Sequence, residues 1–134
     1  MSFDWKQYLT LAEHIAPSLA SRVPNKTILP ALGTEAKLRT SISRAYYSAF
    51  SCARAYLESS TGASYRFPGA HTEVRNRFRS MSSRQARQIG ADLARLYEDR
   101  KKADYDDAVN GLDSTTELAL ITAHDIIIAV ETLT

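Results

Sequence analysis

The stretch "TEAKLRTSISRAYYSAFSCARAYLESS", residues 34–60, decides the fold, because it predicts one long amphipathic helix. Its apolar side chains recur at steps of three and four, which gathers them on one side of an α-helix. They are Leu38, Ile42, Ala45, Tyr46, Ala49, Ala53, Tyr56 and Leu57. Thr34 is expected to cap the helix at its start, and Gly62 is placed to end it in the left-handed conformation that glycine adopts without strain.

Shorter amphipathic helices are predicted on both sides of this one. Residues 3–20 carry an apolar stripe at helical spacing, but Pro17 predicts a kink or an early end near Ala16, since proline removes a backbone hydrogen bond. A helix is also expected over 71–80, buried through Val74 and Phe78. Two further helices are predicted from their capping boxes, in which two side chains satisfy backbone donors: Ser82 with Gln85, and Ser114 with Glu117.

No segment alternates apolar and polar residues over the length of a strand, so the predicted fold class is all-α, an antiparallel up-and-down bundle of four to five helices. The last helix is nearly all apolar and holds the run "DIIIAV" at 125–130, which predicts either a central helix or one packed against a second subunit. With 134 residues, 44% of them hydrophobic and 24% charged, the chain is expected to form a single domain over residues 1–134.

Several classes of protein and site are not expected. The chain has one cysteine, Cys52, and neither a secretory signal nor an apolar run long enough to cross a bilayer, which favours a cytoplasmic protein that does not enter a membrane. His14, His71 and His124 fall in three different predicted helices, and none has a ligand partner at i+4 spacing. No metal and no cofactor are therefore expected.

Charge is segregated along the chain. Residues 66–102 hold ten Lys and Arg against four Asp and Glu, whereas the chain from residue 103 onward holds seven acidic residues and no Lys or Arg. This pattern indicates an anionic partner, self-association through complementary charge, or helix faces that are only solvated. Arginine presents a planar set of donors that suits phosphate, and Arg84, Arg87 and Arg95 could line one ridge. The helical phase assigns Tyr46, Tyr56 and Tyr97 to the core, and leaves Tyr47, Tyr65 and Tyr105 as candidates for stacking on bases.

Three segments in a fixed order carry a resemblance to a known family: "SRAYYSAFSCARAYLE" (43–58), "HTEVRNRF" (71–78) and "LYEDRKKADYDD" (96–107). Together they make the chain resemble the HEPN superfamily, and most closely the small stand-alone HEPN proteins with an R-x-x-A-D-Y signature. The resemblance implies a helical bundle that forms a homodimer, with the signature helices facing each other across a shared cleft. Many HEPN domains are metal-independent ribonucleases that use the Arg and His of an R-x(4–6)-H motif. Others are toxins whose antitoxin is a small nucleotidyltransferase, and some have been proposed only to bind RNA or nucleotides.

Arg100 matches the arginine of that motif, whereas the positions where the motif has its histidine hold Tyr105, Asp106 and Asp107. The leading hypothesis is therefore a homodimer that binds RNA or a nucleotide, as part of a toxin–antitoxin or defence system. Its cleft is expected to contain Arg44, Tyr47, Arg100, Asp104 and Tyr105.

In this site Arg100 would hold a phosphate, Asp104 would orient Arg100 from the i+4 position, and Tyr105 would stack on a base or offer its hydroxyl. The Arg100–Asp104 pair is expected on an exposed helix face, so an Arg100→Ala variant is expected to keep its melting temperature. Two alternatives remain open. The chain could be an endoribonuclease toxin in which His71 or Tyr105 replaces the motif histidine beside Arg100, or the helical partner of a nucleotidyltransferase, with Tyr105 as the residue that is modified.

Overall fold

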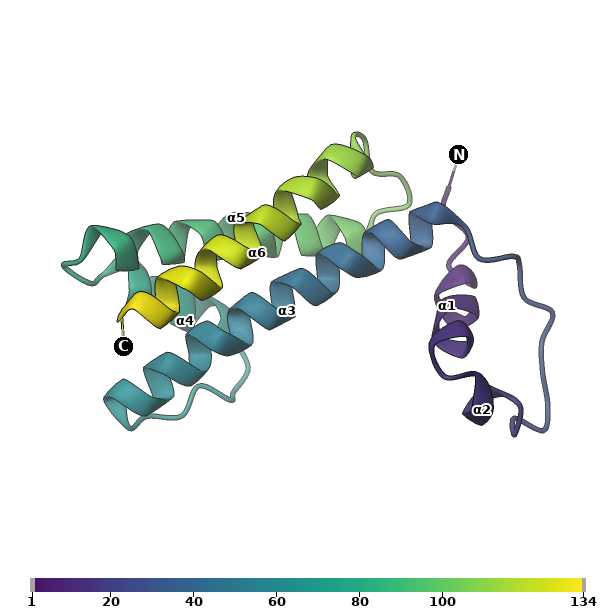
Figure 1. Ribbon diagram of the computed structural model, residues 1–134, viewed down its shortest axis with the longest axis horizontal. Helices are drawn as coiled ribbons and strands as arrows, with labels where there is room; N and C mark the ends of the chain where they lie inside the picture. Colours follow the sequence, from purple (N-terminus) through teal and green to yellow (C-terminus); the bar gives the residue numbers. More distant parts are fainter. Residues whose placement is uncertain (1, 134) are drawn as a thin grey trace.

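Residues 2–133 are described by the computed structural model, and six helices form within them. They are α1 (Gln7–Ile15), α2 (Pro17–Ala20), α3 (Thr34–Thr61), α4 (Ala70–Arg79), α5 (Arg84–Tyr105) and α6 (Leu112–Leu133). The three long helices run back and forth along the length of the molecule, α5 antiparallel to both α3 and α6, while α4 lies at one end (Figure 1). The prediction of an all-α bundle is confirmed, with one or two helices more than expected.

The core forms where α3 packs against α5 and α6, and where α4 packs against α5. Of the apolar stripe predicted on α3, Ile42, Tyr46 and Leu57 are at most 1% exposed. Val74 and Phe78 of α4 are also completely buried, as predicted. Burying a side chain of this size stabilises a fold by about 1.5–3 kcal/mol, so these contacts fix how α3, α4 and α5 sit together.

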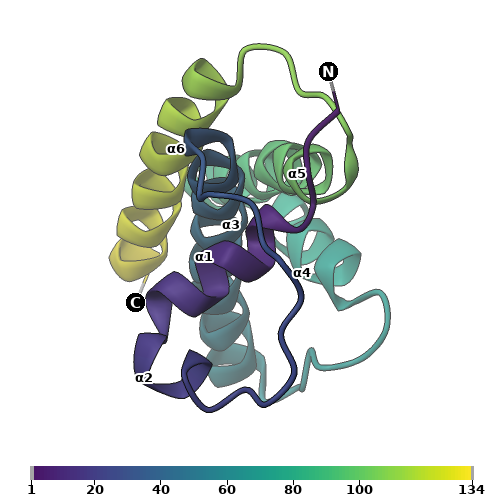
Figure 2. The same ribbon diagram turned by 90° about the vertical axis from the view of Figure 1, so that its right-hand side faces the viewer.

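The amino-terminal helix is interrupted at the position predicted from Pro17. Ala16 has a non-helical backbone (φ −125°, ψ 62°), and Pro17 starts α2 at the first helical position, where its missing N–H is not needed. The region expected to be one helix is therefore two. Together they form an arm that projects from one end of the bundle, with α1 crossing the start of α3 (Figures 1 and 2).

The helix ends follow the sequence in part. Gly62 ends α3 in the left-handed conformation at φ 75°, which confirms that prediction. The capping box predicted at Ser82 is wrong by one residue, because it is the hydroxyl of Ser83 that accepts the N–H of Ala86. Ser114 does not cap α6 either, since that helix has already begun at Leu112.

Two helices approach closely at Gly90. A Cβ atom added there would lie 2.7 Å from the carbonyl oxygen of Arg75 and 2.6 Å from Cγ of Arg79. Only a residue without a side chain lets α4 pack this near to α5, and the position of Arg75 therefore depends on Gly90.

The last helix is not central. One side of α6 is buried through Ala119, Ile126 and Val130, but its other side exposes four large apolar residues by 45–60%. These are Leu118, Leu120, Ile121 and Ile128. Of the two positions considered for α6, a central one is therefore ruled out. No helix within residues 2–133 is long and apolar enough to cross a membrane.

A completely buried arginine ties the amino-terminal segment to the end of α5. Arg39 donates hydrogen bonds from Nη1 to the carbonyl oxygens of Ala103 (2.8 Å) and Asp106 (2.7 Å), and from Nη2 to that of Asp107 (3.3 Å). Its guanidinium stacks on Phe3, 4.5 Å from the ring centre, and pairs with Glu35. Arg39 thus supplies donors to the carbonyl groups that a helix end leaves without partners, and it holds the carboxyl end of α5 in place.

Candidate functional site

Arg100 lies inside a cluster of tyrosines, not on an open surface. It is only 7% exposed, and its Cζ atom lies between 5.1 and 5.9 Å from the ring centres of Tyr46, Tyr47, Tyr97 and Tyr105. A guanidinium is attracted to the faces of such rings, most strongly where water is excluded. The expectation of an exposed ion pair is therefore wrong. Because Arg100 is buried, we now expect Arg100→Ala to lower the melting temperature.

Asp104 balances the charge of Arg100. Its Oδ2 accepts hydrogen bonds from Nη1 of Arg100 at 3.2 Å and from the hydroxyl of Ser43 at 3.3 Å. Burial is the largest single influence and acts to lower the pKa of Arg100. The hydrogen bond and charge of Asp104, together with Tyr47 and Tyr105, outweigh it, so the pKa is raised and the guanidinium stays charged. Arg100 Nε is buried and has no hydrogen-bond partner among residues 2–133, which leaves one donor unused.

The predicted α3 residues lie beside this pair. The Cζ atom of Arg44 lies 5.2 Å from the ring centre of Tyr47, and that of Arg100 lies 5.5 Å from the same centre. Tyr47 is thus in contact with two guanidinium groups, of which Arg44 is exposed. Tyr105, at the end of α5, is 71% exposed. The five residues predicted from the sequence are brought together, although they come from two helices.

His71 joins the cluster from α4. A hydrogen bond of 2.6 Å links its Nδ1 to the hydroxyl of Tyr46, and its ring stacks on Phe50 with 4.3 Å between ring centres. Tyr46 in turn lies under Arg100. The pKa of His71 is lowered, first by burial and then by Arg100, Arg75 and Arg54, so the imidazole is neutral at pH 7. The sequence-based guess that His71 approaches Arg100 from the neighbouring helix agrees with this arrangement.

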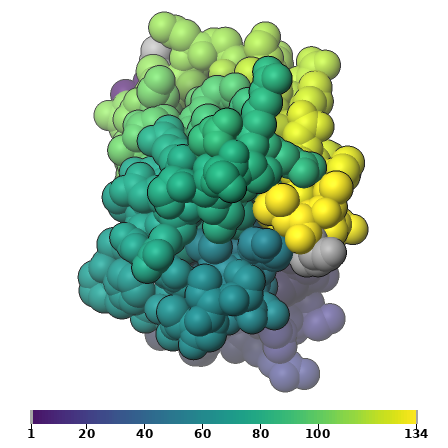
Figure 3. Space-filling model, turned by 90° about the vertical axis from the view of Figure 1, so that its left-hand side faces the viewer, coloured from purple at the N-terminus to yellow at the C-terminus, as the bar shows by residue number. Residues whose placement is uncertain are grey.

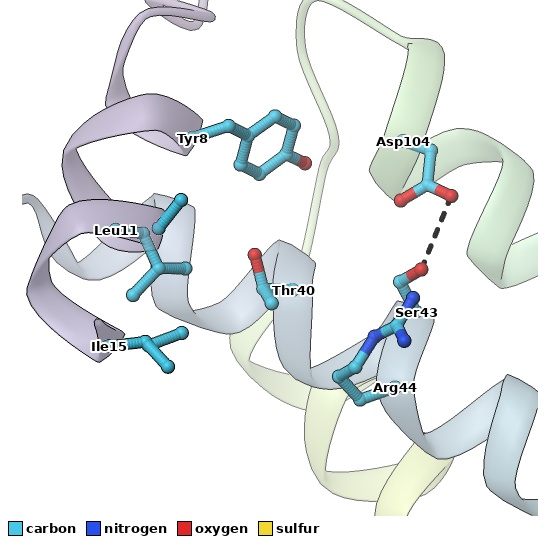
Figure 4. A pocket seen from close by; sticks show the side chains of 8 residues that line it. Tyr8, Leu11, Ile15, Thr40, Ser43, Arg44 and Asp104 are labelled. Carbon is cyan, nitrogen blue, oxygen red and sulfur yellow. Dashed lines mark hydrogen bonds between the residues drawn. The ribbon is translucent and has the colours of Figure 1, made fainter. Parts of the chain in front are cut away.

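A pocket of about 260 Å³ opens between the arm and the bundle (Figure 4). Tyr8, Leu11 and Ile15 of α1 form its apolar wall, and Thr40, Ser43 and Arg44 of α3 face them across the gap. Asp104 lies at its edge, where the hydrogen bond from Ser43 leaves the other carboxylate oxygen available. The pocket therefore combines an apolar surface with an acceptor and a cation.

Other predicted candidates have local structural roles. Arg87 donates to the carbonyl groups of Met81 and Ser82, and Arg95 bonds Thr122 and pairs with Asp92, so they do not form a free ridge with Arg84. Tyr65 was a stacking candidate but is 3% exposed and belongs to the core. Within residues 2–133, no three His, Cys, Asp or Glu side chains are grouped so that they could hold a metal ion.

Sequence reasoning missed Arg39 and Arg54. Arg39 falls among polar residues of α3, and nothing in the local pattern distinguishes it from a solvated arginine. Arg54 could have been found from spacing, because Arg44, Tyr47 and Arg54 are separated by three and seven residues and so share one face of a helix.

No protein-family model matches the chain, and no curated protein or solved structure matches it.

Proposed function

We propose that this protein is a HEPN-like homodimer that binds RNA or a nucleotide at a cleft beside Arg100. The observation that carries the proposal is the grouping of Arg44, Tyr47, Arg100, Asp104 and Tyr105 around one tyrosine cluster. Guanidinium groups bind phosphate and exposed aromatic rings stack on bases, so this set supplies both of the contacts that an unpaired nucleotide needs.

The exposed Arg44 is the first contact for a phosphate, since it forms no ion pair within the described part of the chain. The adjoining pocket of about 260 Å³ supports a nucleotide base, with Leu11 and Ile15 against its face and Asp104 accepting a hydrogen bond from it. A pocket with mostly apolar walls and a few polar groups is typical of small-molecule sites.

Fluorescence anisotropy with a labelled single-stranded RNA, and calorimetry with AMP, test this function. Arg44→Gln is the variant to use, because Arg44 is exposed and its loss leaves the core intact. We expect affinity to fall by about tenfold, the size of one charged contact of roughly 1.4 kcal/mol. Arg77→Gln on α4, which removes another exposed cation, one that is paired with Glu73, is the matched control. The control should bind RNA and AMP as tightly as the wild type. If Arg44→Gln also binds both as tightly as the wild type, the proposed site is wrong.

A second candidate function, a metal-independent endoribonuclease, is favoured by the position of His71. Its imidazole is neutral, and its hydrogen bond to Tyr46 uses Nδ1 and not Nε2. Arg100 contacts the ring of the same Tyr46. With Nδ1–H donating to the Tyr46 hydroxyl, Nε2 would accept the proton of a 2′-hydroxyl whose oxygen attacks the adjacent phosphorus. The bond from phosphorus to the 5′-oxygen then breaks, the released 5′-oxygen takes a proton from water, and a cyclic phosphate forms. Labelled RNA incubated with the protein and EDTA should then be cleaved by the wild type and not by His71→Phe. RNA that stays intact with the wild type excludes this activity.

A further inference from the structure

Two arginines at the other end of the tyrosine cluster form no ion pair with a carboxylate in the described part of the chain. Arg54 stacks on Phe50 and Arg75 on Tyr97, with 5.4 Å and 4.9 Å from Cζ to the ring centres. Neither forms an ion pair within residues 2–133, and each has a buried N–H group without a partner, Nε in Arg54 and Nη1 in Arg75. Glu58, one turn beyond Arg54, bonds to Tyr65 and Arg66 instead.

These two cations gather around one imidazole. The ring centre of His71 lies 4.3 Å from that of Phe50 and 5.6 Å from that of Tyr97. The guanidinium of Arg54 stacks on Phe50, and those of Arg75 and Arg100 stack on Tyr97. Asp104 is the one carboxylate paired with any of these three guanidiniums in the described chain, and it belongs to Arg100. Neighbouring like charges repel one another, and buried donors without partners destabilise the protein. A bound anion would relieve both effects.

The two ends of the cluster lie on one continuous surface of α3. Arg44, Tyr47 and Arg54 are spaced so that they share one helix face, and ten residues of α-helix extend about 15 Å. A ligand that reaches both ends must therefore carry more than one phosphate along its backbone. Figure 3 shows the end of the molecule toward which this surface leads, where the carboxyl-terminal turns of α3 lie next to α4 and the start of α5.

We infer that Arg54 and Arg75, on either side of His71, form a second phosphate-binding subsite, and that the ligand is a single-stranded polynucleotide spanning both subsites. The inference rests on the proposed function, since the first subsite is the one at Arg44. A single strand fits because stacking on Tyr47 and Tyr105 requires unpaired bases. AMP would fill the Arg44 end alone.

The test is the salt dependence of binding a labelled 12-nucleotide single-stranded RNA. Each phosphate contact to a single strand contributes about −0.7 to the slope of log Kobs against log salt concentration. Arg54→Gln and Arg75→Gln are each expected to reduce the magnitude of the slope by about 0.7 and affinity several-fold, whereas AMP binding stays unchanged. Arg77→Gln serves again as the control, and circular dichroism checks that each variant is folded.

Wild-type slopes in Arg54→Gln and Arg75→Gln would overturn the inference while leaving the proposed function standing. So would equal affinity for AMP and the 12-mer, or tighter binding of a duplex. If the wild type binds neither RNA nor AMP, the proposed function and the polynucleotide ligand both fail, and the subsite itself is then tested with inorganic pyrophosphate. Pyrophosphate should raise the pKa of His71, measured by NMR, in the wild type and not in Arg75→Gln; no change in the wild type would reject the subsite as well.

Discussion

Replacing Arg39 by methionine should destabilise the protein strongly. Methionine fills much of the space of the arginine stem but donates no hydrogen bond, so the bonds to Ala103, Asp106 and Asp107 are lost. Hydrogen bonds from a charged donor stabilise by about 1.5–3 kcal/mol each. Two of these carbonyl groups keep another donor, because Tyr8 also bonds to Ala103 and Phe3 to Asp107. Relief from burying the guanidinium offsets part of the loss.

The net loss in the free energy of unfolding is therefore about 2–4 kcal/mol. With an unfolding entropy of about 2.1 cal/mol/K per residue, this corresponds to roughly 7–14 °C in the melting temperature of this 134-residue chain. Circular dichroism at increasing temperature measures it, and Arg44→Met on the exposed face of α3 is the control, expected to change stability by no more than about 0.5 kcal/mol. In hydrogen exchange, the Phe3 amide should lose its protection before the core does. A decrease of less than about 2 °C, with Phe3 still protected, would refute the role given to Arg39.

Three further predictions concern the ends and contacts of α4 and α5. Burial beside arginines lowers the pKa of His71 below 6.5, so the unfolded chain binds a proton that the folded chain does not. The free energy of unfolding should therefore fall as the pH drops below about 6.5. Urea titrations should show a weaker dependence on pH for His71→Phe than for the wild type in this range. Gly90→Ala should lower stability by about 1–3 kcal/mol, since the new methyl group meets the backbone of Arg75, and unchanged urea unfolding would contradict the close packing. Ser83→Ala should lose about 0.5–2 kcal/mol, whereas Ser82→Ala should be neutral by thermal unfolding; the reverse order would move the cap back to the residue predicted from sequence.

Local patterns predicted the helices well because they depend on neighbouring residues. The apolar spacing of α3, the left-handed Gly62 and the break before Pro17 all follow from the chain within a few residues of each site. The errors are also local in kind. Two candidate serines stood next to each other at the start of α5, and sequence could not choose Ser83 over Ser82, because backbone geometry selects the cap.

The sequence predicted which residues of the candidate site lie together, but not how deeply they are buried. Arg100 was predicted from the motif and Arg44 from the family resemblance. The Arg100–Asp104 pair was nevertheless expected in water, because i+4 spacing shows which residues can meet and not what covers them. The cover comes from Tyr46 and Tyr47, more than fifty positions away in the chain.

The sequence by itself determined that this chain is helical, where α3 ends and where the amino-terminal helix is interrupted, since periodicity, glycine and proline act on the backbone around them. Only the tertiary structure decided which arginines are neutralised. Arg39 bonds to carbonyl groups at the end of α5, Arg100 pairs with Asp104 beside the tyrosine rings, and Arg54 forms no ion pair within residues 2–133. The physical reason is that burial and charge compensation depend on side chains from separate helices, which come together only after α3, α4 and α5 have packed.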